Sequence, residues 1–242
     1  MTEKAKNYLI LGGTSGVGFS LAKYLSKHSN IDVFGRDPKK IKAFNSPNIN
    51  FFSHEILSLD ETVHEIKKAS GEKRYDGVFV STGSESFKRL GAIRQDDINK
   101  IFNPPIISLL SVLHLASNGE LMKEDSSIVA MSSVSSERGK SGMSLYGSSR
   151  AAIESLIKHS SNELAKRKIR INGVRAGAFK SDMHQRITDK MIPDQLKEYE
   201  KLHLLGFGET KDIRDLIIFL FSEKSTWFTG SIITIDGGFL AR

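Results

Sequence analysis

The chain has 242 residues, 39% of them hydrophobic, and a formal net charge of +7. It contains no cysteine, which excludes disulfides, thiolate metal ligands and thiol nucleophiles. No run of about 18 apolar residues is present, so the sequence predicts no membrane span.

The positive charge is scattered along the chain. Its densest group, at 166–170, lies at a predicted helix end, where cations suit the helix dipole, so we expect no nucleic-acid partner. The segment MTEKAKNYLI passes directly from charged residues into a strand-like run and lacks the apolar stretch of a secretory signal. Together with the lack of cysteine, this pattern favours a cytoplasmic protein.

Strand-like and helical patterns alternate over the whole chain. Strands are expected at 8–11, 31–34, 50–52, 77–81, 127–132, 169–174 and 231–235. Helices are expected at 16–28, before 77, and at 94–118, 146–167 and 212–221. This alternation predicts an α/β fold with a doubly wound, mostly parallel sheet and helices on both faces. No linker or repeat interrupts it, so we expect residues 1–242 to form a single domain.

The first expected strand runs into the first helix through the glycine-rich stretch LILGGTSGVGFSLAKYL. Gly12 allows a tight exit from the strand, Gly16 lets backbone N–H groups approach a phosphate, and Gly18 lets the helix lie close to the sheet. The pattern indicates a dinucleotide site, and the alternative is a turn that binds nothing. The expected ligand contacts of this turn are Gly12, Thr14, Ser15, Gly16, Val17 and Gly18.

Further landmarks follow this turn in a fixed order. They are VFVSTG, Asn103, the MSSV segment with Ser133, Tyr146, RINGVRAG and the ending TGSIITIDGG. With them the sequence resembles the short-chain dehydrogenase/reductase family over essentially its whole length. The resemblance implies a single-domain fold of Rossmann type, a nicotinamide dinucleotide cofactor, no metal, and a small carbonyl compound or secondary alcohol as substrate.

The form of the cofactor is suggested by the end of the second expected strand. NAD-preferring members of the family carry an acid at the place of Gly35, where it holds the adenosine ribose. Glycine cannot repel a 2′-phosphate, and the following Arg36 can pair with one. We therefore expect NADP(H), with NAD(H) as the alternative. The competing interpretation makes Arg36 a solvated loop residue that faces Asp37.

The resemblance implies more cofactor contacts further along the chain. Glu55 and Ile56 correspond to the adenine side, although a surface carboxylate would give the same pattern at Glu55. Residues 178–182 are expected to pass the nicotinamide carboxamide, with Ser181 near the pyrophosphate. The full set of later contacts is Glu55, Ile56, Ser81, Gly83, Tyr146, Arg150, Gly177, Phe179 and Ser181.

Two hydroxyl groups form the expected catalytic pair. Ser133 ends a buried strand thirteen residues before Tyr146, which is the separation that the family uses. The resemblance implies that Ser133 orients the substrate oxygen while Tyr146 exchanges a proton with it as hydride moves. The alternative is that Tyr146 is an ordinary half-buried aromatic residue.

Arg150 departs from the family at the centre of the mechanism, because the family has lysine there. Arg150 shares a helical face with Tyr146. A phenol ordinarily has a pKa near 10, so a neighbouring cation is needed to favour the phenolate at neutral pH. Arginine supplies that field but cannot pass protons as lysine can.

The substitution leaves several functions open. The leading hypothesis is an oxidoreductase in which Arg150 replaces the lysine, and the alternative is a dinucleotide-binding sensor or a catalytically weak partner subunit. Isomerisation or elimination by the same tyrosine has no specific support in the sequence.

Asn103 matches an asparagine that holds a water of the family's proton relay, so it joins Ser133, Tyr146 and Arg150 as a candidate catalytic residue. Because Pro104 and Pro105 follow it, the sequence predicts that Asn103 avoids helical backbone angles. The structural interpretation makes Asn103 the cap of a helix that restarts at the prolines.

The polar segment at about 183–205 corresponds to the family's substrate lid. Its chemically interesting residues are expected to be solvated and lack the spacing of a metal site: His184, Gln185, Arg186 and His203. Phe87, Leu90 and Ile93 are expected at an apolar edge of the pocket or on a helix core face. Because many family members are tetramers, we expect a homo-oligomer, either a tetramer or a dimer.

Overall fold

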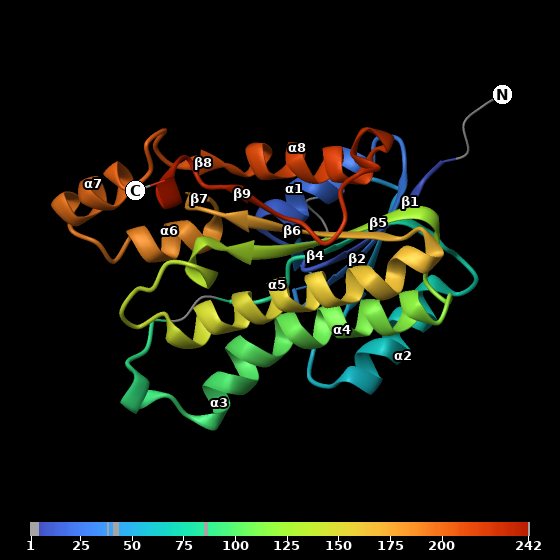
Figure 1. The fold of residues 1–242 in the computed structure, drawn as a ribbon, viewed down its shortest axis with the longest axis horizontal. Coiled ribbons are helices and arrows are strands. Elements are labelled where there is room, and N and C mark those ends of the chain that lie inside the picture. Colours follow the sequence, from blue (N-terminus) through green and yellow to red (C-terminus); the bar gives the residue numbers. More distant parts are fainter. Residues whose placement is uncertain (1–4, 38, 41–43, 85–86, 242) are drawn as a thin grey trace.

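The computed structural model describes residues 5–37, 39–40, 44–84 and 87–241. Within these ranges, seven parallel strands form one sheet in the order β3-β2-β1-β4-β5-β6-β9 (Figure 1). They are β1 (Asn7–Leu11), β2 (Asn30–Gly35), β3 (Ile49–Ser53), β4 (Tyr75–Val80), β5 (Met122–Ser133), β6 (Arg170–Ala176) and β9 (Ile232–Ile235). Two short strands, β7 (Phe179–Lys180) and β8 (Gly208–Glu209), pair with each other beside the main sheet.

Helices cover both faces of the sheet, as Figure 1 shows. One layer holds α1 (Gly16–Leu25) and α8 (Thr210–Phe221), and the other holds α2 (Leu59–Ser70), α4 (Asn103–Ser117) and α5 (Ser144–Leu164). The other α-helices in the described ranges are α3 (Gln95–Asp97), α6 (Asp182–Thr188) and α7 (Pro193–Lys201). The predicted doubly wound α/β fold is therefore confirmed. None of the helices in the described part of the chain is long and apolar enough to cross a membrane.

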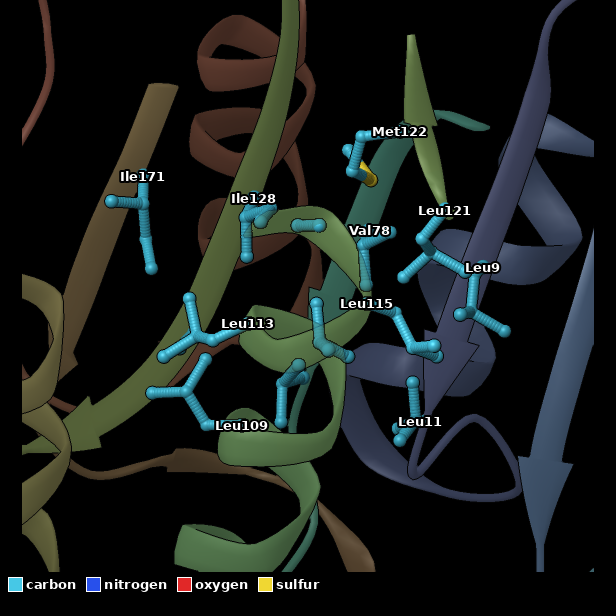
Figure 2. Close-up of a cluster of buried hydrophobic side chains, with 14 of the residues drawn as sticks. Leu9, Leu11, Val78, Leu109, Leu113, Leu115, Leu121, Met122, Ile128 and Ile171 are labelled. Atoms are coloured by element: carbon cyan, nitrogen blue, oxygen red, sulfur yellow. The ribbon is translucent and has the colours of Figure 1, made fainter. Parts of the chain in front are cut away.

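The alternating side chains of β1 divide the core into two layers. Leu9 and Leu11 pack with residues of α2, α4 and α5, and Figure 2 shows part of this cluster. Tyr8 and Ile10 point to the opposite face and pack with α1 and α8. This alternation follows from the two-residue repeat of a strand, and burial on both faces explains why the strands read as continuous apolar runs.

The strand order places the carboxyl ends of β1 and β4 next to each other, because the chain winds outward from β1 in two directions. In open α/β sheets, ligands bind in the crevice at such a reversal point. The first glycine turn follows β1, Ser81 follows β4, and Ser133 ends β5. The fold therefore gathers three of the predicted site segments at one edge of the sheet.

Candidate active site

The turn between β1 and α1 depends on its glycines. The backbone of Gly12 has φ of 90°, and a Cβ there would lie 2.9 Å from the carbonyl carbon of Ser81. A Cβ on Gly18 would lie 2.4 Å from the carbonyl oxygen of Gly12, so a side chain would push α1 away from the turn. The sequence therefore folds into a tight cradle at the start of α1.

Gly16 leaves the inner side of this cradle open. Its φ is 53°, and the nearest atom to a Cβ built there is 4.0 Å away on Ser181. The N-cap residue of α1, Ser15, makes no side-chain hydrogen bond to the helix. The first backbone N–H groups of α1 thus remain available to an anion at a helix N-terminus.

A cavity of about 600 Å³ extends from this cradle across the carboxyl edge of the sheet. Most of the predicted cofactor and catalytic residues lie on its wall: Gly12, Thr14, Ser15, Gly16, Val17, Arg36, Ser81, Gly83, Ser133, Tyr146, Arg150, Gly177, Phe179 and Ser181. Four predicted residues are not among those that line it: Gly18, Glu55, Ile56 and Asn103. Gly18 instead packs against the backbone of Gly12 behind the cradle. Glu55 is exposed.

Ser133 and Tyr146 reach the cavity from adjoining segments. Ser133 ends β5, and its Oγ accepts a hydrogen bond from the backbone N–H of Ser135 at 3.2 Å. Tyr146 lies in the first turn of α5. A Cβ on Gly147 would lie 2.4 Å from the carbonyl oxygen of Ser135, so only glycine lets α5 start this close to the turn after Ser133. This close packing brings the two half-buried hydroxyl side chains to one wall.

Arg150 is buried, with 5% of its surface exposed. The Cζ atom of its guanidinium lies 4.8 Å from the ring centroid of Tyr146, in a cation–π arrangement. Its Nη1 atom donates to the carbonyl oxygens of Thr82 and Met131, both at 3.4 Å, whereas Nε has no partner in the described part of the chain. The guanidinium is therefore fixed against the phenol ring by backbone carbonyls rather than by a carboxylate.

Gly83 makes room for this guanidinium. Its φ is 129°, and a Cβ there would lie 2.3 Å from Nη2 of Arg150. Thr82, beside it, donates from Oγ1 to Ser108 Oγ at 2.7 Å and so ties the end of β4 to α4. The segment after β4 thus forms the floor under Arg150.

An ion pair that the sequence did not suggest lies behind the two hydroxyls. Glu154, one turn after Arg150 on α5, is 7% exposed and pairs with Arg175 of β6 at 2.7 Å between Oε2 and Nη2. Its Oε1 also accepts from Ser132 Oγ at 2.7 Å and from Ser136 Oγ at 2.6 Å. This network joins α5 to β5 and β6 on both sides of Ser133.

The network sets the charge of Glu154. Burial raises the pKa of its carboxyl group, but the hydrogen bonds from Arg175, Ser136 and Ser132 and the charge of Arg175 outweigh burial, so the net pKa is lowered. Glu154 is therefore a carboxylate at neutral pH. Because it is held by Arg175, it does not neutralise Arg150, four residues earlier on the same helix.

The nucleotide side of the cavity carries Arg36 but no acid at the end of β2. A Cβ on Gly35 would lie 2.4 Å from Cγ2 of Thr14, so an acidic side chain has no room there without a shift of Thr14. Arg36 is exposed on the cavity wall, and within the described ranges it makes no ion pair with Asp37. Asp37 accepts instead from the backbone N–H of Lys39 at 2.9 Å.

The prediction for the backbone of Asn103 is wrong. Asn103 has φ of −66° and ψ of −47°, and it is itself the first residue of α4 rather than a cap outside it. A π-helical turn, Ile98–Phe102, precedes it and accommodates Pro104. Because Pro104 has no N–H, the carbonyl oxygen of Lys100 accepts a hydrogen bond from Ser84 Oγ instead, at 3.4 Å. The Asn103 side chain donates to Asn99 Oδ1 at 3.2 Å, away from the cavity wall.

The expectation of solvated lid histidines is also wrong. His203 is 3% exposed. Its Nε2 atom accepts a hydrogen bond from the backbone N–H of Ala178 at 3.1 Å, and its Nδ1 atom lies 3.3 Å from the carbonyl oxygen of Tyr199. The Nε2 atom of His184 is buried and has no partner in the described residues. Burial lowers the pKa of both imidazoles, which favours their neutral forms.

Other parts of the lid agree better with the sequence. Gln185 and Arg186 are exposed. Among the described residues, no group of three or more histidine, aspartate or glutamate side chains is placed to hold a metal ion.

In the segment after β4, Phe87 lies on the cavity wall as expected. Leu90 and Ile93 do not line the cavity, and Leu90 is 71% exposed, so the expectation of a pocket edge or a helix core face is wrong for Leu90.

Comparisons with known proteins find relatives over nearly the whole chain. A family model described as enoyl-(acyl carrier protein) reductase matches residues 55–240. Carbonyl reductase family member 4 of Xenopus laevis is 28% identical over 239 residues, with 95% of each chain covered. The 3-oxoacyl-(acyl-carrier-protein) reductase FabG of Rickettsia felis is 27% identical over 240 residues, with 97% of each chain covered.

Solved structures also resemble the chain. A short-chain dehydrogenase family protein from Francisella tularensis superposes with a TM-score of 0.88 at 25% identity, covering 98% of this chain and all of the other (100%). A variant of ElxO with NADPH bound has a TM-score of 0.84 at 26% identity, with 98% and 100% covered. The likeness thus extends over nearly the whole chain.

Proposed function

The chain belongs to the short-chain dehydrogenase/reductase family of oxidoreductases, and we propose that it interconverts a carbonyl compound and a secondary alcohol with NADP(H). One observation carries the proposal: Ser133 and Tyr146 share a cavity wall with the glycine cradle of α1. Two of the relatives are named as reductases of carbonyl or 3-oxoacyl compounds, which supports this reaction class.

The cradle fits a dinucleotide. Gly16 leaves the start of α1 open to a pyrophosphate, and a side chain at Gly12 would clash with the backbone of Ser81 and displace the turn. Arg36 would pair with a 2′-phosphate, and Tyr146 and Arg150 would contact the nicotinamide ribose. When bound, NADPH supplies the hydride that reduces the carbonyl carbon.

The protein residues would provide the proton and the orientation. In reduction, the O–H of Tyr146 donates its proton to the carbonyl oxygen, and the resulting phenolate is stabilised by the guanidinium over its ring. Ser133 Oγ accepts from the N–H of Ser135, which leaves its own proton free to donate to the same carbonyl oxygen. Tyr146 then regains a proton from solvent, and oxidation of the alcohol reverses these steps.

Titration with NADPH and NADH by fluorescence, followed by absorbance at the nicotinamide band with a panel of ketones and aldehydes, tests the proposal. We expect tight NADPH binding and oxidation of NADPH that depends on the carbonyl compound. Arg150 favours a second candidate, a dinucleotide sensor or catalytically weak partner subunit, because a guanidinium cannot pass protons. Tight binding without turnover of any compound would support the sensor and contradict the reductase.

Replacement of Arg36 by alanine should weaken NADPH binding by about tenfold, since a charge-assisted contact to the 2′-phosphate is lost. NADH affinity should stay nearly constant, because NADH lacks that phosphate. Fluorescence titrations of both cofactors measure the change, with Lys39→Ala as the matched control for loss of an exposed cation in the same loop. If the ratio of NADPH affinity to NADH affinity is unchanged in Arg36→Ala, the proposed contact between Arg36 and the 2′-phosphate is contradicted.

Three broader expectations stay predictions. They are assembly as a homo-oligomer, a cytoplasmic location, and a lid function for the segment that contains α6 and α7. Light scattering of the purified chain tests the first, and the change in protease sensitivity of residues 183–205 on adding NADPH and substrate tests the third.

A further inference from the structure

A lysine ammonium is held between two aromatic rings at the substrate side of the cavity. The Nζ atom of Lys140 lies 4.9 Å from the ring centroid of Tyr199 and 5.5 Å from that of Phe87. The three residues come from the segment between β5 and α5, from α7, and from the segment after β4, and all three line the cavity. Cation–π contacts fix the position of an ammonium without neutralising its charge.

Lys140 has no acidic partner. Within the described ranges it makes no ion pair, although many of the other lysines do. Two acidic residues lie on the cavity wall, Asp37 and Asp182; Asp37 follows β2, and Asp182 pairs with Lys40 of the same loop at 3.4 Å. The acids therefore belong to the nucleotide side, and the surroundings of Lys140 favour an anion.

Tyr199 connects this cation to the catalytic centre. Burial raises the pKa of the Tyr199 phenol, and repulsion by the phenolate form of the nearby Tyr146 raises it further, so Tyr199 stays neutral. Tyr199 also lies against His184 and Phe207, with ring centroids 6.3 Å and 5.3 Å away, which holds its ring in place. Because Lys140, Tyr199 and Tyr146 line the same cavity, an anion at Lys140 would share that cavity with the proton donor.

The wall around these groups is largely apolar. It includes Met131, Val134, Met143, Ile187, Leu202 and Phe239. A substrate that fits this wall has an aliphatic body, and the ammonium of Lys140 adds one site for negative charge. Lys140 is not the only cation on this wall: Arg138 packs on Phe239, with its Cζ atom 4.6 Å from the ring centroid, and Arg150 lies against Tyr146. An apolar wall that carries fixed cations selects between substrates of equal size by their charge.

We propose that Lys140 binds a carboxylate of the substrate, so that the preferred substrates are aliphatic oxo acids rather than neutral ketones. The inference rests on the proposed carbonyl reduction and adds the substrate class. In the bound complex the carboxylate contacts the ammonium of Lys140, the aliphatic chain contacts the apolar wall, and the ketone oxygen faces Ser133 and Tyr146.

Matched pairs of oxo acids and their esters test this class. The pairs are levulinate with ethyl levulinate and acetoacetate with ethyl acetoacetate, each with NADPH. We expect each acid to have a lower KM than its ester, and Lys140→Met to raise the KM of the acids by about tenfold with kcat nearly unchanged. The KM of the esters should not rise in Lys140→Met, and Lys140→Arg should keep the preference for acids. Lys190→Met, which removes an exposed lysine that does not line the cavity, is the matched control.

Calorimetric titration of levulinate into the NADP⁺-loaded protein gives an independent readout that needs no turnover. We expect binding to the wild type and about tenfold weaker binding to Lys140→Met. Equal affinity of the two proteins, or no binding to the wild type, would overturn the inference. It would also be overturned if acids and esters had equal KM values, or if acetoacetyl-coenzyme A were reduced in preference to acetoacetate. Levulinate binding that depends on Lys140, without reduction of any carbonyl compound, would instead refute only the proposed reaction.

Discussion

Replacement of Tyr146 by phenylalanine should lower kcat for carbonyl reduction by about a thousandfold. The phenol is the proton donor in the proposed reaction, and phenylalanine keeps the ring on which the guanidinium of Arg150 rests, so the packing at the floor of the cavity should survive. NADPH affinity should fall far less than kcat, because the variant loses only the contact of the Tyr146 hydroxyl with the ribose. Stopped-flow absorbance of NADPH consumption measures the rate, and fluorescence titration measures the affinity.

The matched control is Tyr24→Phe, which removes a hydroxyl from an exposed tyrosine of α1 and should leave kcat unchanged. Measuring kcat for the same two variants in an Arg150→Lys background tests whether any active form can work without the phenol. A Tyr146→Phe protein that keeps a substantial fraction of the wild-type kcat in either background would show that another group supplies the proton.

Replacement of Arg175 by methionine should lower the free energy of unfolding by about 3 kcal/mol. The change leaves the carboxylate of Glu154 buried between α5 and β5 without its cation, and removing one partner of a buried pair costs more than removing both. The double variant Arg175→Met/Glu154→Met should therefore regain most of the lost stability. Urea denaturation at neutral pH measures all three proteins.

The pH dependence of this loss follows from Glu154. The folded protein holds the pKa of Glu154 below its ordinary value of 4.5, so the stabilisation by the pair is complete above that value and is lost as the pH falls below it. The stability gap between wild type and Arg175→Met should narrow as the carboxyl group becomes protonated. Lys100→Met, which breaks an exposed pair with Asp96, is the control and should change stability much less. A gap that stays constant down to acid pH would show that Glu154 is not the group left unpaired.

The sheet was predictable because its strands are buried on both faces. The apolar runs around residues 8–11 and 127–132 mark β1 and β5, and the glycine turn fixes where α1 begins. Ser133 and Tyr146 were paired through the spacing that the family resemblance implies, and both lie at the ends of elements that line one cavity. β5 begins at Met122, earlier than expected, because polar residues at its start conceal a pairing with Tyr75 of β4.

Long-range contacts explain what the sequence did not reveal. Glu154 and Arg175 are separated by a helix end and a loop, and charged residues at such positions usually face solvent. His203 reads as a polar lid residue, and only the packing of Phe239 and Phe207 against it shows that it is buried. Asn103 was misjudged because the rule for residues before proline does not anticipate a π-helical turn.

The shared space of Arg150 and Gly83 has a consequence for hydration. A shorter side chain at position 150 would open a gap beside the backbone of Gly83, and at φ of 129° that position tolerates no side chain that could fill it. Solvent would enter the gap, because the carbonyl groups of Thr82 and Met131 would lose the donor that they now share. The residue at position 150 therefore controls the access of water to the cavity floor. Protein engineers could tune that access by substitution at this one site.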